Sequence, residues 1–284
     1  MSAGIDIPAM GTPDKTSIGL ADPLGLLGRH AGRLEVSTGT VPAASSPWPG
    51  CAYAAEAYVP REPWSPVGAR LSESLLEEPC RLNRCVVVGR IPARNLAGLR
   101  SKARAMWADD GASAATGEAT EMLLASLPRM VRCESLVGEQ GPALLADVAP
   151  TMTICPQTRL RVGLHIDDHD RQRIHKRDTA PGRLSINLGS GLRYFLYLPF
   201  DLEALVDACE VDQPGRDARL ERRTADAISA EFLASYPRAP VLRIPLNPGE
   251  YYLAPTENLI HDGAAPPGMG RSFTFTVRGY FSHD

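Results

Sequence analysis

The second half of the chain is divided into short apolar runs, and this pattern limits the possible folds more than any other feature of the sequence. Each run is rich in β-branched, leucine and aromatic residues and is bounded by turn residues. The runs are LLADVA, TMTIC, LRVGLHID, RLSINLG, LRYFLYLPF, VLRIPL, YYLAP and SFTFTVRGYF. Many short strands in succession predict a sandwich or a barrel, so we expect a mainly β fold with flanking helices. Gly189-Ser190-Gly191 is a hairpin turn by composition.

The first half of the chain has a different character. Residues 1 to 80 are dense in glycine, proline, alanine and serine and show no sustained periodicity, which predicts an irregular N-terminal segment. The run CVVVGRI then predicts a strand that opens a domain over residues 81 to 284. Helical spacing follows from Pro92 to about Trp107 and over Glu118 to Leu127. A helical insertion is predicted at about 201 to 236, where it is a candidate lid or packing element.

Composition and charge narrow the range of partners. The net charge of −3 and the absence of a basic stretch argue against a nucleic-acid partner. No run of about 18 apolar residues could span a membrane. The six cysteines include no CxxC pair, and the first residues lack the features of a signal peptide. We therefore expect a cytoplasmic protein with a small-molecule partner, and the sequence leaves its oligomeric state open.

The residues that carry chemistry begin at His165-Ile166-Asp167. Side chains at positions i and i+2 of a strand point to the same face, so this imidazole and this carboxylate project together while Ile166 points away. Two ligands of one metal can then come from three consecutive residues. A third ligand from a neighbouring strand would complete a two-histidine, one-carboxylate iron site, and His261 is the candidate.

Some ambiguity surrounds this motif. Asp167 and His169 form a second same-face pair, although His169, Asp168, Asp170 and His175 are better explained as solvated or supporting residues.

Arg271 stands ten residues beyond His261, where its guanidinium can bind a carboxylate with two hydrogen bonds. Arg278 is its rival, and alternation places the two arginines on opposite faces of a regular strand.

The ordered set His165, Asp167, His261 and Arg271 resembles the Fe(II)/2-oxoglutarate-dependent dioxygenase superfamily, over roughly Val86 to Phe281. The resemblance implies a double-stranded β-helix, or jelly roll, with the first three residues as iron ligands. It also implies that Arg271 pairs with the distal carboxylate of 2-oxoglutarate. Phe273 stands where a Ser or Thr commonly follows that arginine, so the hydroxyl partner must come from elsewhere, with Thr153, Ser185, Tyr197 and Thr256 as candidates.

The resemblance further implies that Fe(II), 2-oxoglutarate and O2 are consumed together to hydroxylate, desaturate or cyclise a small molecule. An amino acid or a natural-product intermediate is the expected class of substrate, and succinate and CO2 are released. Asn187 and Arg183 share one face of the predicted strand RLSINL. Either of them can touch the co-substrate or the substrate, or both can be outward polar residues.

Two other functions fit the same residues. A cupin-type metal enzyme would use iron or another divalent metal without 2-oxoglutarate, and would not need Arg271. A metal-free jelly-roll binding module would use the same histidines and aspartate only as hydrogen-bonding groups. Metal binding and succinate formation distinguish these alternatives from the oxygenase.

Overall fold

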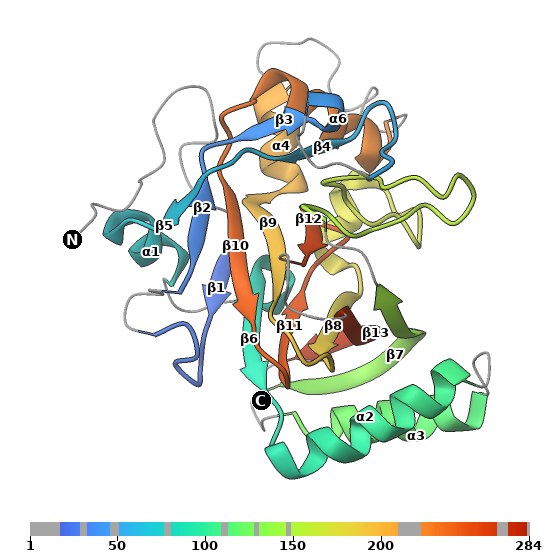
Figure 1. Ribbon diagram of the computed structural model, residues 1–284. Helices are drawn as coiled ribbons and strands as arrows, with labels where there is room; N and C mark the ends of the chain where they lie inside the picture. Colours follow the sequence, from blue (N-terminus) through green and yellow to red (C-terminus); the bar gives the residue numbers. More distant parts are fainter. Residues whose placement is uncertain are drawn as a thin grey trace.

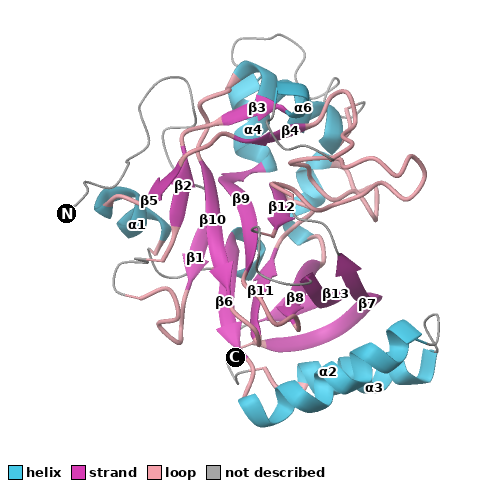
Figure 2. Ribbon diagram, viewed as in Figure 1, coloured by secondary structure: helices cyan, strands magenta, loops and turns pink. Residues whose placement is uncertain are grey.

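The computed structural model describes residues 18–28, 33–45, 51–76, 81–108, 113–127, 131–145, 149–209, 223–265 and 272–282. Its centre consists of two β-sheets, with helices at opposite ends of the molecule (Figure 1). The fold is mainly β with flanking helices, as the apolar runs predict (Figure 2).

The larger sheet has six strands in the order β1-β6-β11-β8-β13-β7. Apart from the parallel pair of β1 and β6, its neighbours run antiparallel. The strands are β1 (Gly19–Ala21), β6 (Cys85–Arg90), β7 (Arg132–Leu145), β8 (Gly182–Asn187), β11 (Glu250–Ala254) and β13 (Ser272–Ser282). Residues from β8, β11 and β13 therefore lie in adjacent rows, for example Tyr252, Ser185 and Thr276.

The second sheet has five antiparallel strands in the order β12-β9-β10-β2-β5. They are β2 (Glu35–Ser37), β5 (Trp64–Pro66), β9 (Arg193–Asp201), β10 (Val241–Leu246) and β12 (Leu259–Ala264). A separate ribbon pairs β3 (Thr40–Pro42) with β4 (Tyr58–Pro60). The turn between β8 and β9 carries the chain from one sheet to the other. Gly189-Ser190-Gly191 is therefore a turn but not the predicted hairpin, because the strands on its two sides do not pair with each other.

The helices cover the outer faces of the two sheets. Figure 1 shows α2 (Ala93–Ala108) and α3 (Ser113–Leu124) side by side next to β7, while α4 (Leu202–Cys209) and α6 (Ala225–Ser235) lie at the opposite end. Helix α1 (Ala69–Leu75) lies beside β1. Three short 3-10 turns complete the described elements: η2 (Ala43–Ser45), η3 (Leu82–Arg84) and η4 (Ile174–Thr179).

Three apolar clusters hold these layers together. One is shared by the two sheets and joins Val86 of β6 to Phe195 of β9. A second packs α2 and α3 against the outer face of the larger sheet. The third packs α4 and α6 against the outer face of the second sheet and includes Ile166 and Phe200. Burial of these side chains at about 25 cal/mol per Å² is the main stabilising contribution.

Two sequence predictions need correction. The described part of the N-terminal segment is not merely irregular, because it supplies β1, β2 and β5 to the two main sheets and Leu20 and Leu34 to their shared core. The run LRVGLHID does not form a continuous strand. Only Arg161 and His165 make isolated bridges, because Gly163 has a left-handed φ of 75° that interrupts the extended chain.

Candidate metal centre

His165 and His261 are brought together by direct pairing of their backbones. The His165 amide donates to the His261 carbonyl at 3.1 Å, and the His261 amide donates to the His165 carbonyl at 2.8 Å. The segment around His165 thus runs along β12 as a single antiparallel bridge, with the two ring centroids 4.8 Å apart. Asp167 is fixed next along the chain, because its amide donates to the Thr256 carbonyl.

Both imidazoles are oriented by a hydrogen bond from the ring nitrogen that faces away from Asp167. His165 Nδ1 lies 2.8 Å from the Gly163 carbonyl, and His261 Nδ1 lies 3.3 Å from the Leu259 carbonyl. A carbonyl can only accept, so Nδ1 carries the proton and Nε2 keeps its lone pair. The Nε2 atoms lie 3.6 and 3.7 Å from the two carboxylate oxygens of Asp167. This is the tautomer that a metal-binding histidine requires.

Local packing explains why these three consecutive residues adopt the required directions. Ile166 is buried in the apolar cluster beneath α4 and α6, so the flanking side chains turn the other way, as alternation predicts. A Cβ atom at Gly163 would lie 2.5 Å from the Tyr58 carbonyl of β4. Glycine is therefore required where the chain approaches β4 and offers its own carbonyl to His165.

The charge state of the group suits a divalent cation. Burial alone would raise the pKa of Asp167, but the adjacent Arg183 guanidinium and the two histidines hold it well below its usual value. Arg183 Nη2 lies 2.6 Å from Asp167 Oδ2. Burial lowers the pKa of His261 to about 3, so its imidazole is neutral near pH 7. One anionic carboxylate and an unprotonated imidazole face a common point.

The donor atoms fit a metal ion. Asp167 Oδ2 is buried and pairs with the Arg183 guanidinium, whereas His261 Nε2 is buried without a hydrogen-bond partner among the described residues. One potential ligand atom from each of His165, Asp167 and His261 lies within 4.8 Å of the others. Leaving a polar atom buried without a partner costs free energy, and a coordinated cation would remove that cost. Two imidazoles and one carboxylate suit a non-haem Fe(II) site with open positions.

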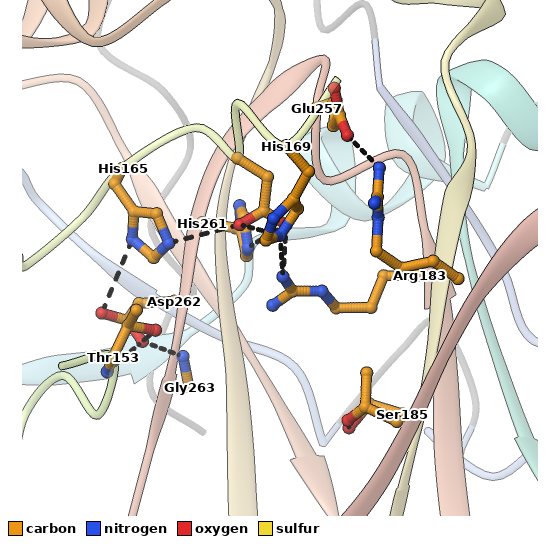
Figure 3. Close-up of polar contacts among 12 residues, drawn as sticks. Thr153, His165, His169, Arg183, Ser185, Glu257, His261, Asp262 and Gly263 are labelled. Atoms are coloured by element: carbon orange, nitrogen blue, oxygen red, sulfur yellow. Dashed lines mark hydrogen bonds and ion pairs between the residues drawn. The ribbon is translucent and has the colours of Figure 1, made fainter. Parts of the chain in front are cut away.

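A fourth residue, Asp262, lies next to His165 on the side away from Asp167. It was not identified from the sequence. Its Oδ1 accepts hydrogen bonds from the Met152, Thr153 and Gly263 amides and from the Thr153 hydroxyl. Its Oδ2 lies 3.9 Å from His165 Nδ1 (Figure 3). The carboxylate therefore favours a proton on the outer nitrogen of His165, which supports the metal-binding tautomer. Adjacency to His261 was the only signal in the sequence.

A cavity of about 320 Å³ opens beside His261 between the two sheets. The smaller sheet contributes His261, Gly263 and Arg193 to its lining, and the larger sheet contributes Arg183, Ser185 and Tyr252, with Thr274 and Thr276 on β13. This volume is at the lower end of the range for small-ligand sites. None of the described residues of α4 or α6 lines it, so these helices pack against the sheet and do not wall this cavity.

Two arginines were predicted candidates for pairing with a carboxylate of 2-oxoglutarate. Arg271 lies outside the described residues. Arg278 is on the same face of β13 as Thr274 and Thr276, but its guanidinium is committed to Glu257 and to Asp170 Oδ2 at 3.0 Å. Arg177 also pairs with Glu257, at 3.2 Å, and with Asp168. These charges form a paired cluster next to the metal ligands and do not serve as a free anion site.

The remaining predicted residues take distinct positions. Asn187 supports the turn between β8 and β9, because its side chain donates to the Gly191 carbonyl and to the Leu246 carbonyl of β10 and accepts from the Gly189 amide. His169 is exposed, with Nε2 3.2 Å from Arg183 Nη2. Among the hydroxyl candidates, Thr153 and Ser185 line the cavity, whereas Tyr197 and Thr256 are not among the residues of its lining.

The comparisons with known proteins do not assign the chain to a family. No family model matches the sequence, and no curated protein is significantly similar to it. Within the described residues, no helix has the length and apolar character needed to cross a membrane. The argument for function therefore depends on the site.

Proposed function

We propose that this protein is an Fe(II)- and 2-oxoglutarate-dependent oxygenase that hydroxylates, desaturates or cyclises a small organic molecule. The observation that carries the proposal is the group His165, Asp167 and His261, in which one potential ligand atom from each residue lies within 4.8 Å of the others. The separation of HxD from the distal histidine in sequence and their pairing in space agree with that superfamily's ligand order.

The strand connections support a jelly roll. Strands β7, β13, β8 and β11 are consecutive neighbours in one sheet, and β12, β9 and β10 are consecutive neighbours in the other. The segment at His165 bridges the free edge of β12 and occupies the position of a fourth strand in the second sheet. The chain passes between the sheets at β8 to β9, β10 to β11, β11 to β12 and β12 to β13. Two four-stranded antiparallel sheets with such crossings are the jelly-roll arrangement.

In this proposal His165, Asp167 and His261 hold the iron by one face. When bound, iron would supply the activation of O2 that is coupled to loss of the first carbon of 2-oxoglutarate as CO2. One oxygen atom would enter succinate, and the other would enter the substrate in a hydroxylation or leave as water in a desaturation or cyclisation. The residues of the chain supply the environment. Asp262 and the Gly163 carbonyl keep His165 in one tautomer, and Arg183 keeps Asp167 ionised and fixes its direction.

The cavity suits the co-substrate better than a macromolecule. It lies between the two sheets and combines hydroxyl groups with arginine side chains beside His261. Charged and hydrogen-bonding groups in a site shielded from bulk water bind a small anion strongly. The net charge of −3 also argues against a nucleic-acid substrate, so a small molecule is the proposed substrate class.

The experiment that tests this function needs no knowledge of the substrate. Purified protein is supplied with Fe(II), ascorbate, O2 and 2-oxoglutarate labelled at its first carbon. Labelled CO2 and unlabelled succinate are measured. The reaction is run first without a further substrate and then with pools of amino acids and other small metabolites. We expect succinate and CO2 in equal amounts, increased by the correct pool and absent in His261→Ala. Metal binding without any decarboxylation would contradict the proposal and favour a cupin-type enzyme.

A further inference from the structure

Arg193 is a partly buried cation with which no described carboxylate forms an ion pair. It begins β9 and lines the cavity, and its Nη1 atom is buried without a hydrogen-bond partner among the described residues. No described carboxylate forms an ion pair with it, although Asp262 lies close enough to influence its electrostatics. Burial lowers the pKa of its guanidinium, and the nearby Tyr252 and Asp262 oppose this shift. A buried guanidinium is costly unless something pairs with it.

The chain makes room for this side chain next to the metal ligands. A Cβ atom at Gly263 would lie 3.0 Å from Arg193 Nη2, so the guanidinium passes over a position that has no side chain. Gly263 follows His261 by two residues on the same strand and therefore shares its face. At about 3.4 Å per residue, the guanidinium is placed about 7 Å along β12 from the His261 backbone.

Hydrogen-bond donors surround the same part of the cavity. Tyr252 lies across from Arg193 on the larger sheet, stacked on Phe195 with ring centroids 3.9 Å apart. Burial raises the pKa of Tyr252, so its phenol keeps its proton. The hydroxyls of Ser185 and Thr276 are 3.0 Å apart in the same lining. An anion beside Arg193 would therefore meet neutral hydroxyl donors and no carboxylate on the facing sheet.

From these contacts we infer that Arg193 binds the carboxylate of 2-oxoglutarate that lies farther from the metal, with Tyr252 and the neighbouring hydroxyls as additional donors. This inference rests on the proposed function. It assigns the carboxylate to β9 of the second sheet, whereas the family resemblance assigns it to Arg271 before β13. Four carbon-carbon bonds separate the two carboxyl carbons, an extended length of about 5 Å. This length plus one hydrogen bond of about 2.9 Å from a carboxylate oxygen to the guanidinium is comparable with the step of about 7 Å along β12.

The other described arginines near the metal ligands are occupied. Arg183 pairs with Asp167, and Arg278 pairs with Glu257 and Asp170. Arg161 donates to the Thr151 and Met152 carbonyls. Arg183 and Arg278 also have a buried Nε atom without a hydrogen-bond partner, but each pairs with a carboxylate. Arg193 lines the cavity, and no described carboxylate forms an ion pair with it.

The test measures binding and not turnover. Calorimetric titrations are made without O2 on Mn(II)-loaded protein, with 2-oxoglutarate and with 2-oxopentanoate, which keeps the 2-oxo acid and lacks the distal carboxylate. The variants are Arg193→Met, Arg193→Lys and Arg271→Met. Arg243→Met is the matched control, because Arg243 pairs with Glu35 and lies over Trp64 away from the cavity. Mn(II) affinity and thermal unfolding are recorded for every variant.

We expect Arg193→Met to weaken 2-oxoglutarate binding on the order of 30- to 1,000-fold, since a buried charge pair loses one partner. Binding of 2-oxopentanoate should be unchanged, so the wild-type preference for 2-oxoglutarate should disappear. Arg193→Lys should retain part of the preference, and Arg243→Met all of it. Mn(II) affinity should remain at the wild-type value in each variant.

Two results would overturn the inference, and they are distinguishable. If Arg193→Met keeps the preference and Arg271→Met loses it, the carboxylate lies at the position given by the resemblance, and the proposed function stands. If wild-type protein binds Mn(II) but neither oxo acid, the proposed function fails together with the inference. Loss of folding in Arg193→Met would itself contradict the account, because removing an unpaired buried charge should leave stability unchanged or higher.

Discussion

Two buried polar clusters lie side by side in this protein. They differ in whether all of their polar groups have partners within the protein. In the first, Glu257 joins Arg177 and Arg278, and each charge has an opposite charge within hydrogen-bonding distance. In the second, Asp167 pairs with Arg183, but the Nε2 atom of His261 is buried without a hydrogen-bond partner among the described residues, and three potential metal-ligand atoms converge there. The first cluster is complete as a structural element. The second needs a ligand, and this difference marks the functional site.

The largest predicted effect concerns the first cluster, whose charges pair with each other. Glu257→Gln removes the charge that faces two buried guanidinium groups, and we expect the free energy of unfolding to fall by about 3–5 kcal/mol. Urea denaturation measures the loss. Glu203→Gln is the control, because Glu203 is 72% exposed and its pair with Arg84 should contribute at most about 1 kcal/mol. Equal losses in the two variants would remove the distinction between the clusters.

The second prediction concerns the unsatisfied cluster. His261→Ala should weaken Fe(II) binding by more than about 100-fold, because one of three donors is lost and an outer-shell residue alone changes affinity by about 10- to 100-fold. Anaerobic Fe(II) titration measures this. His175→Ala, at an exposed histidine of the following 3-10 turn, should bind Fe(II) like the wild type. Wild-type affinity in His261→Ala would show that this residue is not a ligand.

The third prediction is that metal stabilises the protein through the second cluster alone. At a free concentration of 100 times the dissociation constant, a divalent metal should add about 2.7 kcal/mol to the free energy of unfolding. For a chain of this length the melting temperature should rise by roughly 5–10 °C. The increment should disappear with EDTA and in His261→Ala, and should persist in Glu257→Gln. Its loss in Glu257→Gln would mean that the two clusters act as one.

Asp262 gives a smaller and more specific effect. Asp262→Asn places an amide near His165 Nδ1 and removes the charge that favours its protonated form, so Fe(II) affinity should fall by about 10- to 100-fold. The ring position should be retained, because Oδ1 can still accept from the Met152, Thr153 and Gly263 amides. The same anaerobic titration measures the change. Unaltered affinity would assign Asp262 to loop folding only.

The smallest predicted effect tests whether the Asn187 side chain has only a structural role or contacts the co-substrate. Asn187→Ala removes two hydrogen bonds of the β8–β9 turn and one to β10, and should lower the free energy of unfolding by about 1–3 kcal/mol. The affinity of the metal-loaded protein for 2-oxoglutarate should not change. A loss of that affinity at full metal occupancy would instead place Asn187 in contact with the co-substrate.

Much of the fold was predictable because local signals agreed with the final packing. The alternation in RLSINL and the helical spacing after Pro92 correspond to β8 and α2. The segment LRVGLHID was wrong as a strand because its glycine approaches β4, a contact made by residues distant in sequence. The N-terminal strands were missed because each is only three residues long and pairs with partners elsewhere in the chain.

The metal ligands could be predicted from spacing, whereas their supporting residues could not. His165, Asp167 and His261 follow from an i, i+2 pair and an ordered third residue, and the structure brings them together. Arg193 and Asp262 carry no motif, because their roles depend on which side of a sheet they face. Arg278 shows the same limit, since the sequence presents a free arginine and only the packed structure reveals its pairing with Glu257.

The most direct test of the central claim is an anaerobic titration of the wild-type protein with Fe(II), followed by addition of 2-oxoglutarate and measurement of visible absorption. The account predicts one Fe(II) per chain and a new charge-transfer band that requires both compounds and is absent in His261→Ala. If the folded protein binds no Fe(II), or binds it equally well in His261→Ala, the unsatisfied cluster is not a metal site and the proposed oxygenase function is wrong.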